Sequence, residues 1–385
     1  MMYTFDVEVG GGGLSLFAIE LGKKLDPEKF DVSLCSLGYY DSDLGQARIA
    51  KLESDGIKAY ETARWDRDRP YLSFYNSQRN LTKELSAYPV DIIHSHSEYT
   101  DVSAILLKLQ RKAPIILRTV HYGYQYEWST KPLRRVILTN FAYPILFDQE
   151  IGINHTMTDR LNHRKFAKFF KRHALRIPNA ISLERFENFT VDRSKIKRSL
   201  GIPQDTFLIG TVGRLADQKG YCYLIDAAAE VIKDHPKVYF LIIGDGPLAT
   251  DLKRQANKLD LDEQVIFTGG RNDIERLLKC LDLFVSSSLW EGLPTVILEA
   301  MASGLPILAT DIPGTNELIQ HTRNGWLVPP HNSQAISSAI SNLITSPQLN
   351  SEMARRALLT SREYSIDNIS QQYELLYLEL IAGKE

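Results

Sequence analysis

The sequence has 385 residues, of which 44% are apolar and 24% are charged, a composition typical of globular proteins with two or three domains. The formal net charge of −2 predicts no nucleic-acid partner, and three widely spaced cysteines exclude a disulfide framework and a thiolate zinc site. No apolar run reaches the roughly 18 residues of a membrane-spanning helix. The N-terminus carries no basic leader, so we expect a cytoplasmic protein without a signal peptide.

The first half of the chain alternates short β-rich runs with longer helical patterns. This alternation predicts a parallel sheet with helices on both faces. The expected strands are 3–9, 31–37, 90–94, 114–119 and 150–154, and the expected helices are 14–25, 42–54, 72–87, 98–110 and 132–146.

Four glycines, Gly10–Gly13, follow the first expected strand and precede the first expected helix. Glycines let a ligand approach the backbone closely. The segment departs from the GxGxxG pattern of dinucleotide-binding proteins, because Ser15 occupies the last glycine position. The loop is therefore either a ligand contact or a tight turn without a ligand, and a Rossmann dehydrogenase is disfavoured.

Three histidines lie at the ends of expected strands. His94 and His96 share one face of a strand, but no third ligand supports zinc, so a structural or acceptor-side role is favoured over a metal pair. His121 is either a hydrogen-bonded structural histidine or a substrate contact. Two DxD-like segments, 41–43 and 66–68, lie in polar loop sequence, and we expect no metal site.

Residues 160–176 hold seven Lys and Arg and no acid, with Leu161, Phe166, Phe169 and Phe170 interleaved. Such a segment is either a basic amphipathic patch for an anionic membrane or an exposed helix whose aromatic side chains pack inward. Residues 1–185 carry 26 basic against 22 acidic side chains, whereas residues 186–385 carry 19 against 25. This asymmetry favours peripheral membrane or lipid-linked acceptor contact slightly.

The strand and helix alternation restarts after a Pro/Asn break at 177–182, which is the expected hinge. A second doubly wound domain therefore follows the first, and ligands are expected beyond the carboxyl ends of its strands. Its expected strands are 207–212, 238–243, 265–268, 283–286 and 306–309, with helices at 221–234 and 366–381.

Two cations follow the first strand of this second half. Arg214 and Lys219 are five residues apart in the segment from Gly213 to Gly220. Arginine offers a planar fork of donors and lysine a point charge, a suitable pair for two phosphates. An isolated pair of this kind would be two solvated loop cations.

The segment Glu291-Gly-Leu-Pro-Thr-Val-Ile-Leu-Glu299 is the most informative in the chain. It predicts a strand, a tight turn and a helix in which Pro294 occupies the first turn and Gly304 ends the helix. Amides at the start of such a helix can hold a phosphate. One carboxylate could then meet a sugar and the other a ribose.

These motifs in this order resemble the retaining GT-B glycosyltransferases of family 4, the group 1 glycosyltransferases. The resemblance rests on Arg214 and Lys219, the segment 244–247, Glu291 with Glu299, and the segment 324–328. It covers nearly the whole chain and is most specific over residues 205–330. It implies an α/β fold with two doubly wound Rossmann-like domains facing a central cleft.

The resemblance also implies domain limits and roles. An acceptor-side domain would span 1–178, a nucleotide-sugar-binding domain 179–365, and a helix at 366–385 would pack back on the first domain. His121, Glu291, Arg214 and Lys219 would be catalytic, without a metal or cofactor. The implied donor contacts are Gly12, Gly13, Arg214, Lys219, Gly270, Arg271, Glu291, Gly292, Leu293, Pro294, Thr295, Val296 and Glu299.

The expected activity is transfer of a hexose-type sugar from a UDP-, GDP- or ADP-linked donor to a glycan or lipid-linked acceptor, in surface polysaccharide biosynthesis. The alternatives are a GT-B sugar-phosphate synthase or epimerase, and a non-catalytic GT-B regulatory or scaffold subunit. Retention of both cations and both glutamates disfavours the non-catalytic alternative.

Overall fold

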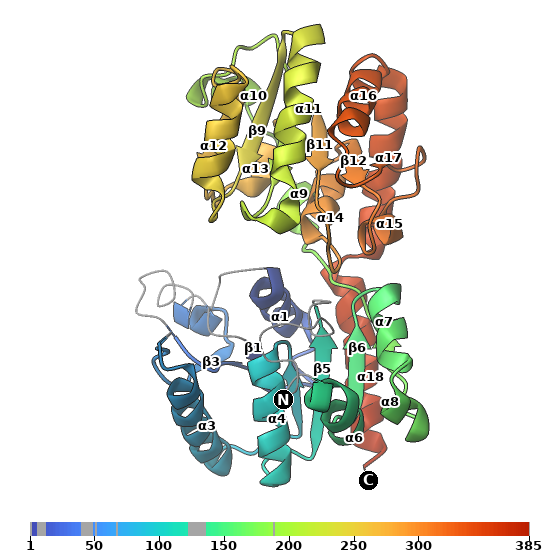
Figure 1. Cartoon of the computed structure of the whole chain (residues 1–385). Coiled ribbons are helices and arrows are strands. Elements are labelled where there is room, and N and C mark those ends of the chain that lie inside the picture. The colour runs from blue at the N-terminus through green and yellow to red at the C-terminus, as the bar shows by residue number, and fades with distance from the viewer. Residues whose placement is uncertain are drawn as a thin grey trace. The chain divides into compact units, whose positions relative to one another are not determined.

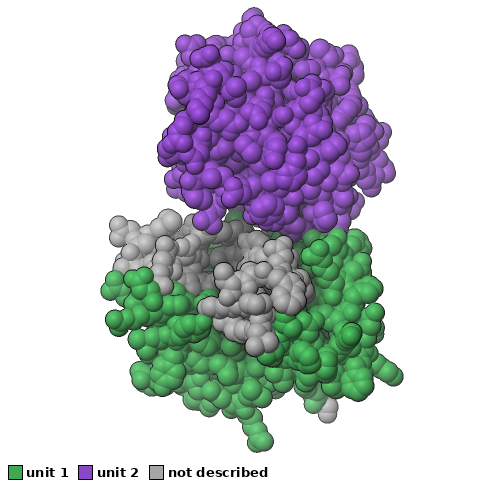
Figure 2. Space-filling view, viewed as in Figure 1, with its two compact units in different colours: residues 1–180, 366–385 green, residues 181–365 purple. Residues whose placement is uncertain are grey.

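The computed structural model describes residues 2–5, 13–39, 49–50, 52–66, 68–121, 136–187 and 189–384. The chain divides into two units, as Figure 2 shows in two colours. Unit 1 comprises Met1–Ala180 and Ile366–Glu385, and unit 2 comprises Ile181–Ser365. Among the described residues, no helix is long and apolar enough to cross a bilayer.

Unit 1 is built on a parallel sheet of seven strands in the order β3-β2-β1-β4-β5-β6-β7. Strand order therefore reverses between β1 and β4. The strands are β1 (Met2–Phe5), β2 (Ser33–Ser36), β3 (Lys58–Glu61), β4 (Ile92–Ser95), β5 (Ile115–Val120), β6 (Gln149–Gly152) and β7 (Leu175–Arg176).

Helices cover both faces of this sheet, as Figure 1 shows. They include α1 (Gly13–Lys24), α3 (Pro70–Ala87), α4 (Glu98–Leu109), α6 (Tyr143–Leu146), α7 (His155–Asn162), α8 (Lys165–Phe169) and α18 (Ile366–Ala382), and a π-helical turn, η2, at Leu138–Ala142 precedes α6. One core lies between the sheet, α1 and α18 and contains Tyr373 and Tyr377, which are both fully buried. A second core includes Leu81 of α3 and Leu107 of α4.

A buried ionic network in unit 1 joins β5, α4 and β6 to the residue before α8. Arg118 on β5 donates to Asp101 on α4 across 3.0 Å and lies 3.5 Å from Glu150 on β6. Arg164, just before α8, pairs with the same Glu150. The Arg118 guanidinium also sits 4.0 Å from the centre of the Tyr143 ring. Burial raises the pKa of Asp101 to about 6, although the Arg118 charge opposes that rise.

Unit 2 is built on a six-stranded parallel sheet in the order β10-β9-β8-β11-β12-β13, the doubly wound arrangement of a Rossmann domain. The strands are β8 (Phe207–Val212), β9 (Val238–Ile243), β10 (Val265–Gly269), β11 (Leu283–Ser286), β12 (Ile307–Thr310) and β13 (Trp326–Val328). The helices of this unit are α9 (Glu184–Glu187), α10 (Arg193–Ser199), α11 (Tyr221–Asp234), α12 (Ala249–Lys258), α13 (Ile274–Leu278), α14 (Thr295–Ala302), α15 (Thr315–Leu318), α16 (Ser333–Ile344) and α17 (Pro347–Glu363).

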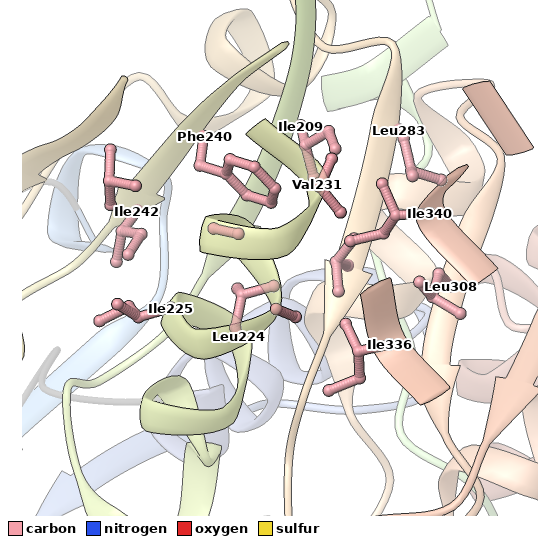
Figure 3. Close-up of a cluster of buried hydrophobic side chains, with 14 of the residues drawn as sticks. Ile209, Leu224, Ile225, Val231, Phe240, Ile242, Leu283, Leu308, Ile336 and Ile340 are labelled. Carbon is pink, nitrogen blue, oxygen red and sulfur yellow. The ribbon is translucent and has the colours of Figure 1, made fainter. Parts of the chain in front are cut away.

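The core of unit 2 forms where α11 and α16 pack on the sheet. Figure 3 shows Leu224 and Ile225 of α11 and Ile336 and Ile340 of α16 among strand side chains such as Phe240. These side chains are at most 2% exposed. The strand ends that carry polar loops are thereby held on a rigid base.

The sequence-based elements agree closely with this fold in unit 2, where four of the five expected strands begin at the residue found. Two edge strands of unit 1, β3 and β7, were not expected, and neither was β13. Pro294 is the N-cap of α14 rather than a residue of its first turn, which corrects the expectation. Gly304 adopts a φ of +78° directly after the C-cap Ser303, so the predicted helix end is confirmed.

Candidate active site

Two polar loops of unit 2 begin at neighbouring strand ends, at the point where strand order reverses. Strands β8 and β11 are neighbours there, but β8 leads toward β9 and β11 leads toward β12. The loops after these two strands therefore diverge, and such switch points are where doubly wound sheets bind ligands. Residues 213–220 follow β8 and residues 287–294 follow β11.

The loop after β8 carries Arg214 and Lys219. Arg214 is exposed, and within the described part of the chain no carboxylate forms an ion pair with it. The Lys219 side chain runs back over Gly213, since a Cβ built there would lie 3.1 Å from Lys219 Cε. The Lys219 side chain therefore lies beside the residue that precedes Arg214.

A neighbouring loop supports this cation pair. A Cβ at Gly244 would lie only 2.0 Å from the Gly213 carbonyl oxygen, and Gly244 has a φ of +138°. The Leu215 amide donates to the Asp245 carbonyl across 2.9 Å. The glycine at 244 therefore allows the loop after β9 to pack directly on the Arg214 loop.

Glu291 forms the centre of a polar cluster. Lys219 Nζ donates to Glu291 Oε1 across 2.5 Å, and Ser288 Oγ donates to the same oxygen across 2.7 Å. Gln218 Nε2 reaches Oε2 at 3.2 Å. Thr310 Oγ1 fixes the Ser288 carbonyl in turn. The Glu291 side chain is 7% exposed, so its carboxylate is held in one orientation by three donors.

The turn between Glu291 and α14 is tightly packed. Leu293 is 4% exposed and anchors the turn in the core, while Thr295 and Val296 open the helix. A Cβ at Gly314 would lie 1.9 Å from the Gly292 carbonyl oxygen, so only glycine fits beside that turn. The first amides of α14 are thereby presented at the same rim as Lys219, where they could hold a phosphate.

Glu299 lies farther along α14, where that helix meets α9. Burial raises the pKa of its carboxyl to about 7, while Arg185 of α9 opposes the rise and Glu275 of α13 adds to it. No hydrogen bond joins Glu299 to Glu291 among the described residues: Glu291 lies in the turn before α14 and Glu299 lies within that helix. A carboxyl of this kind can accept or donate hydrogen bonds to vicinal hydroxyls near neutral pH.

The loop after β10 contains the predicted contacts Gly270 and Arg271. Arg271 donates to both oxygens of Asp273 at 2.8 and 2.7 Å, so its fork is already engaged within the loop. A Cβ at Gly270 would meet nothing within 4 Å, so the backbone there borders open space.

In unit 1, His121 belongs to a buried histidine cluster. His121 Nε2 lies 3.1 Å from His96 Nδ1, and Asn179 is a further hydrogen-bonding partner. Burial lowers the pKa of His121 to about 3 and also lowers the pKa values of His94 and His96. All three rings are therefore neutral near pH 7.

His94 is engaged on both ring nitrogens. Its Nδ1 lies 2.8 Å from the Tyr377 hydroxyl and its Nε2 lies 2.8 Å from Thr119 Oγ1. Both ring nitrogens of His94 are therefore hydrogen-bonded within unit 1, whereas the sequence left a structural and an acceptor-side role open. In the described residues, no group of three His, Cys, Asp or Glu side chains could hold a metal ion.

The structure thus brings Lys219 and Glu291 into direct contact, and Arg214 lies in the same loop after β8 as Lys219. Gly12 lies outside the described residues, and Gly13 is the first residue of α1. Sequence reasoning missed Ser288 and Gln218 as partners of Glu291, and His96 and Asn179 as partners of His121. Only the run Ser286-Ser-Ser288 after a buried strand could have drawn attention to the first of these.

Comparisons with known proteins match both halves of the chain. A family model described as "Glycosyl transferases group 1" matches residues 192–359, and one described as "Glycosyltransferase Family 4" matches residues 11–185. The chain is 28% identical over 392 residues to the UDP-Gal:alpha-D-GlcNAc-diphosphoundecaprenol alpha-1,3-galactosyltransferase of Escherichia coli, which covers 97% of this chain and 95% of that protein.

A second curated relative is the alpha-monoglucosyldiacylglycerol synthase of Streptococcus pneumoniae, 29% identical over 330 residues, or 81% of this chain and 73% of that protein. Among solved structures, Anabaena HepE in complex with UDP and glucose matches with a TM-score of 0.82 at 22% identity. That match covers 98% of this chain and 100% of the other, and it shows a shared fold.

Proposed function

The chain belongs to the group 1 glycosyltransferases of family 4 and has their GT-B fold of two Rossmann-like units, and from this premise we propose that it moves a hexose-type sugar from a nucleotide-diphosphate donor to a glycan or lipid-linked acceptor. Unit 2 is the proposed donor-binding domain, and unit 1 the acceptor-side domain.

The observation that carries this proposal is the Lys219–Glu291 pair at the switch point of unit 2. A cation for a phosphate and an oriented carboxylate for a sugar hydroxyl stand 2.5 Å apart beside the start of α14. Arg214 supplies a second cation that no described carboxylate neutralises. Glu299 lies one and a half turns into the helix, where it would bind the ribose hydroxyls.

The reaction breaks a glycosyl–phosphate bond, and negative charge grows on the leaving diphosphate. Arg214, Lys219 and the α14 amides would stabilise that charge, which is the largest expected contribution to catalysis. Glu291, Gly292 and Leu293 would position the sugar ring. We propose a retaining, metal-independent transfer, in which the leaving phosphate accepts the proton of the attacking hydroxyl on the same face.

The acceptor proposal draws on the relatives. The E. coli relative is named for a diphosphoundecaprenol-linked acceptor and the S. pneumoniae relative for a glycolipid. A lipid-linked acceptor would hold this protein at the inner face of the cell membrane. Residues 160–176 are the proposed peripheral contact.

A thermal-shift screen with UDP, GDP and ADP tests the donor site. A bound nucleotide at 100 times its Kd should stabilise the folded chain by about 2.7 kcal/mol. The matching nucleotide should raise Tm in the native chain and not in Lys219→Ala. Absence of any shift with all three nucleotides would remove the donor proposal.

Removal of divalent metal tests the proposal that the transfer is independent of metal. Two side-chain cations and the helix amides neutralise the diphosphate in this proposal, so turnover should be unchanged, within about twofold, after excess EDTA. Loss of turnover that added Mg²⁺ restores would contradict metal independence. The anomeric configuration of the product, read by NMR, decides between retention and inversion.

A further inference from the structure

We propose that one face of unit 1 docks on an anionic phospholipid bilayer by inserting apolar side chains from two separate segments. Five side chains form this insertion face: Ile137, Phe141, Ile145, Phe169 and Phe170. The inference deepens the peripheral contact proposed above for residues 160–176. It adds residues 136–146, which the charge pattern did not indicate.

The insertion face is exposed and continuous. Residues 136–146 are helical throughout, and Ile137, Phe141 and Ile145 recur at a spacing of four, with exposures of 49%, 42% and 41%. Phe169 on α8 is 77% exposed, the largest value among the exposed large apolar side chains described. Phe166 links the two segments, because its ring centre lies 4.4 Å from that of Phe141 and 6.3 Å from that of Phe170.

The two segments are held in register by a buried arginine. Arg164 Nη1 donates to the Thr139 carbonyl in η2 across 2.8 Å, and Arg164 Nε donates to the Leu161 carbonyl at the end of α7 across 2.8 Å. The same guanidinium pairs with the buried Glu150. The backbone that carries the exposed aromatic side chains is therefore held in place by the buried contacts of Arg164.

Cations surround the apolar side chains. Lys165, Lys168 and Lys171 are all exposed, and in the parts of unit 1 that the structure describes no carboxylate forms an ion pair with any of them. Arg160 and Arg172 are exposed nearby. A polar face rich in lysine beside aromatic side chains suits the headgroup region of an anionic bilayer, where each cation contributes roughly 1 kcal/mol.

Charge complementarity selects the occupant. A second copy of this chain seated symmetrically on the face would bring two sets of these lysines together, and like charges disfavour that contact. A neutral apolar partner would leave the lysines without counter-charges. An anionic bilayer satisfies both the apolar side chains and the cations.

Vesicle flotation with the full chain tests the inference. Vesicles contain phosphatidylcholine alone or with about one-third phosphatidylglycerol, and two double variants are compared: Phe169→Ser with Phe170→Ser, and the control Tyr88→Ser with Leu109→Ser. The control residues are both 64% exposed and lie elsewhere in unit 1. We expect the Phe variant to lose about tenfold or more in partitioning to anionic vesicles, and the control to match the native chain.

Two triple variants test the contribution of the lysine charges to vesicle binding. Lys165→Gln, Lys168→Gln and Lys171→Gln together should reduce partitioning about tenfold or more at low salt. The control triple Lys195→Gln, Lys233→Gln and Lys258→Gln, in unit 2, should not. Equal partitioning of the Phe variant and its control, or no preference of the native chain for anionic vesicles, would overturn the inference.

Two further readouts separate this inference from other outcomes. Sedimentation without lipid should show the same mass for the native chain and the Phe variant, and a dimer abolished by the Phe variant would assign the face to a second copy. The nucleotide thermal shift should be unchanged in the Phe variant, because Phe169 and Phe170 lie outside the donor site. Failure of vesicle binding with an intact nucleotide shift would remove only the membrane contact.

Discussion

Lys219 joins two parts of the proposed donor site, because it contacts Glu291 after β11 and its side chain runs back over Gly213 after β8. Lys219→Ala should lower kcat by about 10²–10³-fold, the usual effect of removing one donor to a developing oxyanion. The change in unfolding free energy should be about 1–3 kcal/mol, because the Glu291 carboxylate is 7% exposed but keeps Ser288 and Gln218 as donors.

Ser288→Ala is the companion variant. It removes one donor to Glu291 but leaves Lys219 and Gln218 in place. We expect a smaller loss of turnover, on the order of tenfold, and a smaller effect on KM for the donor than Lys219→Ala has, because Lys219 and Gln218 still orient Glu291. Normal kinetics in both variants would show that this cluster takes no part in the reaction.

Glu299 makes stability depend on pH. The folded chain raises its pKa from 4.5 to about 7, so the folded state holds this proton more tightly than the unfolded state. The associated stability is present in full below pH 4.5 and is lost as pH rises through 7. Glu299→Gln cannot ionise, so its Tm should exceed that of the native chain by several degrees at pH 8.

That excess in Tm should shrink steadily as pH falls toward 5. The exposed Glu363→Gln is a matched control for the loss of one carboxylate. A difference between Glu299→Gln and the native chain that is constant from pH 5 to 8 would mean that ionisation of Glu299 is not the cause.

At the residue scale, the sequence indicated that Lys219 and Glu291 lie near each other but not which side chains hold them. Lys219 and Glu291 could be placed together because their loops follow strands expected in one sheet. The partners Ser288 and Gln218 depend on the path of two tight loops, which no local pattern encodes. The sequence left two roles open for His121, a structural histidine or a substrate contact. Its contacts with His96 and Asn179 lie inside unit 1.

At the scale of elements, α8 and η2 depend on Arg164. Its guanidinium pairs with Glu150 and binds two backbone carbonyls, so Arg164→Ala would leave a buried carboxylate with Arg118 alone at 3.5 Å. Breaking a buried ion pair in this way costs about 3–5 kcal/mol. We expect the Tm of unit 1 to fall by roughly 10 °C in calorimetry.

Lysine should not rescue this position, because a single ammonium cannot reproduce the planar fork. Arg160→Ala, in the same basic segment but exposed, is the control and should change stability by less than about 0.5 kcal/mol. Equal effects of the two variants would mean that the buried pair contributes nothing specific.

The elements that the sequence predicted best are strands formed by continuous apolar runs. Strands β8, β9 and β11 of unit 2 are such runs and are central in the sheet. The missed strands β3 and β7 are the two edges of the unit 1 sheet, short and partly charged, and pairing with a neighbour defines them more than composition does. Arg164 was counted with six other cations, although its burial with Glu150 appears only in three dimensions.

At the scale of the whole molecule, the last helix completes the first unit. Tyr373 and Tyr377 of α18 are fully buried in the core with Phe17 and Leu21 of α1. Truncation after Ser365 should therefore leave unit 1 without a closed core. Hydrogen exchange should show unit 2 peptides, residues 181–365, still protected and unit 1 peptides exchanging rapidly.

A milder variant controls for general misfolding of the truncated chain. Tyr377→Phe keeps the ring but removes the hydroxyl that meets His94 Nδ1 at 2.8 Å. It should cost about 1–3 kcal/mol in unit 1 and leave unit 2 unchanged. Persistent protection of unit 1 in the truncated chain would contradict the assignment of α18 to its core.

The assignment of residues 366–385 to unit 1 has a consequence during synthesis. A ribosome releases the polypeptide from its N-terminus, so strands β1 to β7 emerge long before the tyrosines that cover them. Unit 2 can complete its own sheet while the earlier half still lacks a helix. The nascent protein should therefore mature in the reverse of reading order, and any chaperone that shields it would act on the older segment last.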